Sequence, residues 1–207
     1  MKKSIICSIA FIMTMNLCAF TVIIDPGHGG KDTGVLGTYL QNSKDIPVYE
    51  KDITLRVSQK PAGAIKQRYP DIQIFLTRED DSFVSLEARQ KKIQTFAHDK
   101  DSISLSIHSS TAMNKNIRGF KIMAQKGSVP FAQYLSEKLS QAIGMQMPNK
   151  GIISDESDSS FMAYKTTDIV LDLGFLSHAD DVALLMNDAF LEQAAVCIAD
   201  SIKSFYR

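Results

Sequence analysis

The stretch "TVIIDPGHGGKDTGVLG", residues 21–37, contains the first strong structural signal of the chain. Its apolar, β-branched opening is typical of a buried β-strand, and the Pro26-Gly27 pair ends that strand. His28 follows at once, among glycines. A histidine at this point could belong to a phosphate-binding loop, lie in a solvated turn, or bind a metal.

The glycine spacing does not favour a nucleotide loop. A Walker loop needs Ser or Thr after its Gly-Lys pair, and here Asp32 follows Lys31. The dinucleotide fingerprint needs G-x-G-x-x-G running directly into a helix, and neither that spacing nor a helical pattern is present. A plain turn and a metal ligand remain as alternatives for His28.

The rest of the chain alternates between strand and helix patterns. Strands are expected at 71–78, 102–110, 118–125 and 168–175, and helices at 51–69, 84–99, 130–144 and 189–206. Pro61 lies inside the first helix, where it predicts a kink or a break, and Ser85 is a plausible N-cap of the second. The fold class predicted is α/β, a single domain with an open, mostly parallel twisted sheet of about six strands and helices on both faces.

Polar residues near the ends of separate strands can meet at one edge of such a sheet, where ligands gather. His28, His108 and Asp172 all lie near a strand's carboxyl end. Zinc accepts neutral imidazole and carboxylate, and a catalytic site holds it with three protein ligands. Glu50 could supply the third ligand, although an acid in the first turn of a helix also favours the helix dipole.

Composition and the N-terminus narrow the function classes. Lys+Arg and Asp+Glu both number 23, so no basic excess points to nucleic acid, and no nucleic-acid partner is expected. Lys2 and Lys3 precede an uncharged apolar run, which predicts a secretory signal peptide over 1–19. The domain then covers 20–207, in a periplasmic or extracellular protein without stable membrane insertion after cleavage. An uncleaved anchor is the alternative.

Five separated motifs now resemble bacterial zinc-dependent N-acetylmuramoyl-L-alanine amidases of amidase family 3. They are "IIDPGHGGKDTG", "EKDITL", "LTREDDSFVSLEAR", "LSIHSS" and "IVLDLGFLSH". The resemblance implies that His28, Glu50 and His108 bind Zn²⁺. It also implies hydrolysis of the amide between N-acetylmuramic acid and the L-alanine of the stem peptide, with peptidoglycan or muropeptides as substrate. It names no regulatory protein partner. Arg78 and Arg89 match family arginines, for which structural ion pairs are expected.

The chain departs from the family at the residue expected to act as the catalytic acid and base. Asp172 stands where the family typically has glutamate, so the carboxylate is one methylene shorter. General-base catalysis needs that oxygen within hydrogen-bond reach of the attacking water or one water away. Asp172 is therefore the expected catalytic residue, with Glu156 as another acid in the chain. Ser109-Ser110 and His178 also depart from the family, and all three are expected to be peripheral, either supporting the ligands from behind or lying on the surface.

Two other functions remain open. A binding protein on an amidase scaffold would hold zinc and muropeptide but turn over poorly, and the short Asp172 motivates that alternative. A zinc peptidase acting on other peptides is the weaker alternative, because the resemblance disfavours it.

Overall fold

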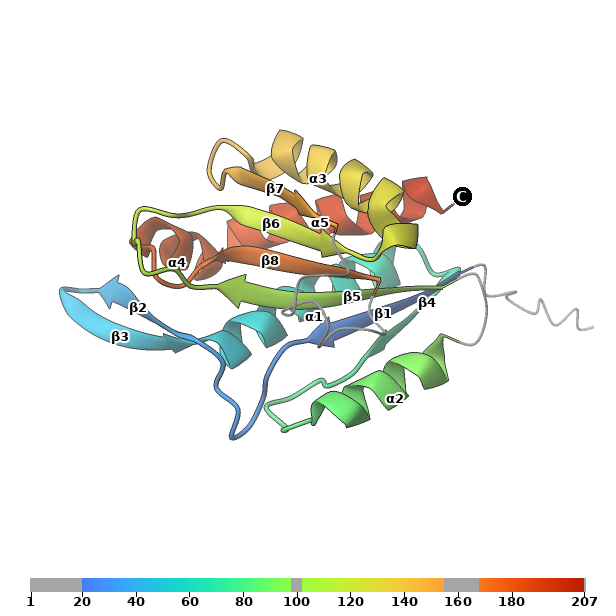
Figure 1. Ribbon diagram of the computed structural model, residues 1–207, viewed down its shortest axis with the longest axis horizontal. Helices are drawn as coiled ribbons and strands as arrows, with labels where there is room; N and C mark the ends of the chain where they lie inside the picture. Colours follow the sequence, from blue (N-terminus) through green and yellow to red (C-terminus); the bar gives the residue numbers. More distant parts are fainter. Residues whose placement is uncertain (1–19, 98–101, 155–167, 207) are drawn as a thin grey trace, which may run out of the picture.

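A computed structural model of the chain describes residues 20–97, 102–154 and 168–206. A six-stranded sheet with the order β4-β1-β5-β8-β6-β7 forms its centre (Figure 1). The first four strands of that order are parallel, while β6 runs antiparallel to β8 and parallel to β7. The strands are β1 (Phe20–Pro26), β4 (Ile72–Leu76), β5 (Ser102–Ser110), β6 (Phe120–Ala124), β7 (Asn149–Ile153) and β8 (Ile169–Phe175). The predicted α/β class and mostly parallel sheet are confirmed.

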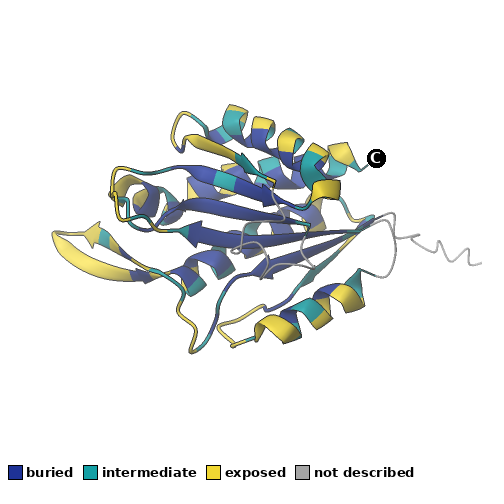
Figure 2. Cartoon of the chain, in the orientation of Figure 1, coloured by how far each residue is buried: buried dark blue, intermediate teal, exposed yellow. Residues whose placement is uncertain are grey.

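Helices cover both faces of the sheet. In Figure 1, α1, α3 and α5 lie behind the strands, and α2 lies in front near β1 and β4. Val22 and Ile24 point into the main core with α1 and α5, whereas Ile23 alternates to the face of α2. The central strands are accordingly buried throughout (Figure 2). The helices are α1 (Glu50–Arg68), α2 (Leu86–Phe96), α3 (Val129–Ile143), α4 (Ala179–Leu185) and α5 (Asp188–Phe205), with a short 3-10 turn η1 (Lys126–Ser128) before α3.

Helix α1 is not broken at Pro61. It continues over 19 residues, although proline removes one backbone hydrogen bond within it. Pro61 is buried and α1 packs along α5, so tertiary packing carries the helix past the proline. Of the two predicted effects, the break is therefore wrong, and the kink stays a prediction. The expected cap of α2 is confirmed, because Ser85 accepts a hydrogen bond from the Ala88 amide.

A two-stranded hairpin of β2 (Leu36–Gln41) and β3 (Lys44–Tyr49) projects from the body, and the sequence patterns did not indicate it. Its turn residues Asn42 and Ser43 both have positive φ, as a two-residue hairpin turn of type I′ requires. Most of the hairpin is exposed (Figure 2). Strand β7 and helix α4 were also not anticipated.

The predicted signal peptide 1–19 and Glu156 lie outside the described residues. Within those residues, no helix taken alone is long and apolar enough to cross a membrane. The successive helices α4 and α5 reach that length and apolar character only together, and they are bent by 75° at their junction.

Candidate metal centre

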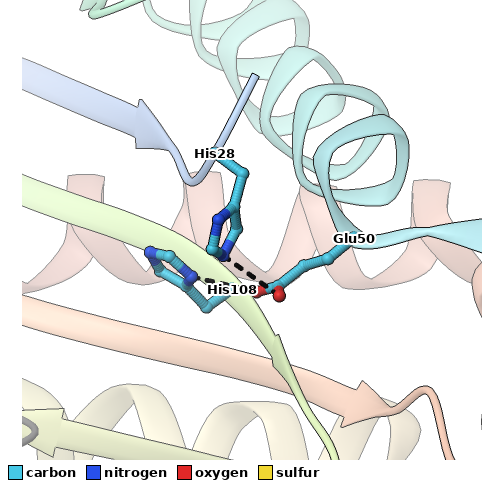
Figure 3. A group of neighbouring side chains, drawn as sticks. All are labelled: His28, Glu50 and His108. Carbon is cyan, nitrogen blue, oxygen red and sulfur yellow. Dashed lines mark hydrogen bonds and ion pairs between the residues drawn. The ribbon is translucent and has the colours of Figure 1, made fainter. Parts of the chain in front are cut away.

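Three side chains from three elements meet at the carboxyl ends of β1 and β5. His28 follows β1, Glu50 opens α1, and His108 lies in β5 (Figure 3). One donor atom from each lies within 4.8 Å of the other two. Glu50 lies between the imidazoles, with His28 Nε2 and His108 Nδ1 each 3.0 Å from one of its oxygens. The predicted convergence of these three residues is present.

The Glu50 carboxylate is almost fully enclosed, with 2% of the residue exposed. Oε1 accepts hydrogen bonds from His108 Nδ1 and the Ser109 amide, and Oε2 accepts one from the Val35 amide at 2.9 Å. Burial raises the pKa of Glu50, but the hydrogen bonds from His108 and His28 outweigh it and hold the pKa far below its usual range. Glu50 is thus an ionised carboxylate whose position is fixed at both oxygens, and its contacts go beyond those of an acid that only favours the helix dipole.

His28 is held in an uncommon backbone conformation, with φ at 62°. Arg89 compensates by donating a hydrogen bond from Nη2 to the His28 carbonyl. The second ring nitrogen, Nδ1, lies 3.0 Å from Asp32 Oδ1, the kind of carboxylate contact that orients a metal-binding imidazole. Burial lowers the pKa of His28, but hydrogen bonding and charge from Glu50, with a smaller contribution from Asp32, raise it overall.

Two glycines lie so close to these side chains that any larger residue would clash with them. A Cβ atom on Gly27 would lie 2.2 Å from Cε1 of His108. One on Gly34, whose φ is +63°, would lie 2.6 Å from Oε2 of Glu50 and 2.7 Å from Cδ2 of His28. The glycine-rich segment therefore brings the backbone close to imidazole and carboxylate groups.

Buried arginines anchor the same loop. Arg89 forms the expected ion pair with Asp25, at 2.7 Å. Arg78 instead donates to main-chain carbonyls, at 3.1 Å to Pro26 and 2.8 Å to Gly27. Both arginines are structural, as expected, but only Arg89 uses a carboxylate. Through these hydrogen bonds, Arg78 and Arg89 connect the segment 78–89 to the backbone of the loop that carries His28.

The donor set matches zinc chemistry. Two imidazoles and one carboxylate form a ligand set that catalytic zinc sites use, with the fourth position left for water or substrate. An ion between the three groups would replace the protons that now link the imidazoles to Glu50. The residues of this centre therefore fit zinc.

Asp172 lies on the neighbouring strand, in register with His108 on one side and Lys121 on the other. Its Oδ2 accepts a hydrogen bond from Ser110 Oγ at 2.6 Å and lies 3.2 Å from Lys121 Nζ. No donor among the described residues contacts Oδ1. The sequence analysis missed Lys121 and treated Ser110 as peripheral. A polar residue in the apolar strand 118–125 was the available signal for Lys121.

The other two departures from the family pattern are structural. Ser109 donates through its amide to Glu50 and through Oγ to the Leu173 carbonyl. His178 caps α4, where Nδ1 accepts a hydrogen bond from the Asp180 amide. His178 is thus at the surface side of the expectation, and Ser109 at its other side, because it supports Glu50 from behind.

Comparison with known proteins agrees with this geometry. A family model described as N-acetylmuramoyl-L-alanine amidase matches residues 22–204. An uncharacterised Bacillus subtilis protein, YqiI, is 29% identical over 90% of this chain and 84% of its own length. The probable amidase AmiB of Haemophilus influenzae is 26% identical, and the alignment covers 89% of this chain but only 40% of AmiB. The catalytic domain of CwlV, an N-acetylmuramoyl-L-alanine amidase from Bacillus (Paenibacillus) polymyxa var. colistinus, superposes with a TM-score of 0.75 at 29% identity, over 90% of this chain and 97% of that domain.

Proposed function

The chain belongs to the N-acetylmuramoyl-L-alanine amidase family, and we propose that it is a zinc-dependent enzyme acting on peptidoglycan. The bond cut is the amide between the lactyl group of N-acetylmuramic acid and the L-alanine of the stem peptide. The single observation that carries this proposal is the meeting of His28, Glu50 and His108 within 4.8 Å. That arrangement is what an amidase needs to hold a Lewis acid.

In this proposal His28, Glu50 and His108 hold the zinc ion. When bound, zinc supplies polarisation of the scissile carbonyl and lowers the pKa of water in the site towards ~7. The buried Glu50 carboxylate adds the negative charge that attracts a cation, and its four neighbours keep it in place.

Asp172 is the proposed acid-base residue. Its Oδ2 is held by Ser110 and Lys121, so Oδ1 is the atom available to accept a proton from the attacking water. The same atom then gives that proton to the nitrogen of the leaving L-alanine. The products are the lactyl carboxylate and a free amine, so the atoms of one water are accounted for. Ser110 and Lys121 act as positioning residues for this step.

The protein would meet this substrate outside the cytoplasm, in the periplasm or beyond. The apolar segment after Lys2 and Lys3 supports export, because peptidoglycan lies in that compartment. N-terminal sequencing of the secreted protein tests this part. A new N-terminus near position 20 is expected, and retention of Met1 in a secreted protein would contradict it.

Mass spectrometry of muropeptides after digestion tests the activity. Purified protein lacking 1–19 is incubated with zinc or with chelator, beside the Asp172→Ala and Asp172→Glu variants. Free stem peptide that disappears with chelator and with Asp172→Ala is the expected result. No product from the unsubstituted protein, together with product from Asp172→Glu, would identify a binding protein instead. A free peptide lacking the sugar, digested in parallel, distinguishes a general zinc peptidase.

A further inference from the structure

A cavity of about 300 Å³ adjoins the candidate metal centre. Its lining includes His28 and His108 of the centre and the segment 83–86, which leads into α2. Small-molecule sites begin at about this volume. The cavity therefore has room for a single compact group beside the centre, and a long peptide does not fit inside it.

The charges that line the cavity do not suit an anionic ligand. Arg89 is the one Lys or Arg among the described lining residues. Its guanidinium already forms an ion pair with Asp25 at 2.7 Å and donates to main-chain carbonyls, including that of Val84 at 3.0 Å. Asp32 adds a carboxylate whose side chain is 48% exposed. An incoming carboxylate would meet no free cation among these lining groups, whereas a neutral ligand with hydroxyl groups could donate to Asp32.

The outer wall of the cavity is apolar and aromatic. Phe83 and Leu86 are 45% and 44% exposed, which is unusual for side chains of this size. Lys31 Nζ lies 4.6 Å from the centroid of the Phe83 ring and restricts its movement. A lining that offers both an aromatic ring and a carboxylate suits a sugar, because a pyranose has a face of C–H groups and a rim of hydroxyls.

We propose that this cavity binds the sugar ring of the N-acetylmuramic acid residue, with Phe83 as the determinant of sugar specificity. The inference rests on the proposed function and assigns a direction to the substrate across the sheet edge. The glycan occupies the side of β1 and α2. The stem peptide then leaves on the other side of β5, over β8 and β6.

Binding measurements on metal-depleted protein test the assignment without turnover. The probes are N-acetylmuramoyl-L-alanyl-D-isoglutamine and the same dipeptide without the sugar, titrated by calorimetry. The variants are Phe83→Ala, Phe83→Tyr and, as a control, Leu40→Ala, which removes an apolar side chain that is 66% exposed on the hairpin and does not line the cavity. Circular dichroism and zinc content report whether each variant keeps its fold and its centre.

The unsubstituted protein is expected to bind the sugar-bearing probe more tightly than the dipeptide. Phe83→Ala should weaken binding of that probe by about fivefold to tenfold and leave the dipeptide unchanged, as expected for loss of one aromatic packing partner. Phe83→Tyr and Leu40→Ala should bind normally. Equal weakening of both probes, no effect of Phe83→Ala, or no preference for the sugar would overturn the assignment. Preference for the sugar without hydrolysis in the presence of zinc would refute the amidase proposal alone.

Discussion

Glu50 and Asp172 are both buried acids beside His108, yet their surroundings differ sharply. Glu50 opens α1 with 2% of its surface exposed, and partners contact both of its oxygens. Asp172 is 7% exposed, and its described partners, Ser110 and Lys121, both contact Oδ2. A carboxylate bound at both oxygens is fixed as an acceptor, whereas one with a free oxygen can still exchange a proton. The difference supports the proposed division of roles, with Glu50 as a metal ligand and Asp172 as the residue that transfers the proton.

The largest expected effect comes from Glu50→Gln. The amide removes the charge and puts a donor beside groups that already donate, so zinc content and activity should fall together. Loss of several kcal/mol of transition-state stabilisation corresponds to about 10³-fold or more in kcat/KM. Elemental analysis and an amidase assay on the same preparation measure both. A Glu50→Gln protein that is active without zinc would refute the assignment of the centre.

Asp172→Asn should distinguish the role of Asp172 from that of Glu50. The variant keeps the shape of the side chain but cannot accept the proton, so kcat should fall by about 10²-fold to 10⁴-fold. Zinc content should stay at the level of the unsubstituted protein, in contrast to Glu50→Gln. Parallel loss of zinc in Asp172→Asn would mean that the two acids share one role.

Lys121→Met tests whether the partner on β6 positions Asp172. Removing the ammonium frees Oδ2 from one of its two contacts, and supporting residues of this type are worth about 10-fold to 100-fold. The loss should fall on kcat, with KM unchanged and zinc retained. Lys121→Arg should recover most of the rate, because it restores a cation at that position. If arginine fails to rescue while the fold is intact, simple positioning by charge is wrong.

Ser110→Ala should give the smallest effect, about a few-fold in kcat. A neutral hydroxyl contributes roughly 0.5–1.5 kcal/mol, and Lys121 still holds the same oxygen. Combining it with Lys121→Met tests whether the two contacts act on one atom. A double variant whose loss exceeds the product of the two single losses would show that either contact alone keeps Asp172 in place.

Local patterns in the sequence were enough to predict much of this architecture. Alternating apolar residues predicted β5, and the β-branched run before Pro26 predicted β1. Because these strands are parallel neighbours, their carboxyl ends bring His28 and His108 together. These strands could be predicted from the sequence because strands buried on both faces contain recognisable runs of apolar residues.

Features that depend on pairing between distant segments were not predictable in the same way. Lys121 reaches Asp172 only because β6 is antiparallel to β8, and no local pattern specifies that direction. The hairpin after Val35 has a turn of Asn42 and Ser43, without the glycine that usually announces it. At Pro61 the local rule was overridden by packing against α5.

The three groups of the centre come from β1, α1 and β5, so the site exists only when distant parts of the chain are already folded together. An ion held there would act as a reversible cross-link that favours the native state over the unfolded one. By mass action, each tenfold rise of free ion above its Kd adds about 1.4 kcal/mol to the free energy of unfolding. The supply of free ion would then influence how long the protein survives proteolysis as well as its rate of catalysis.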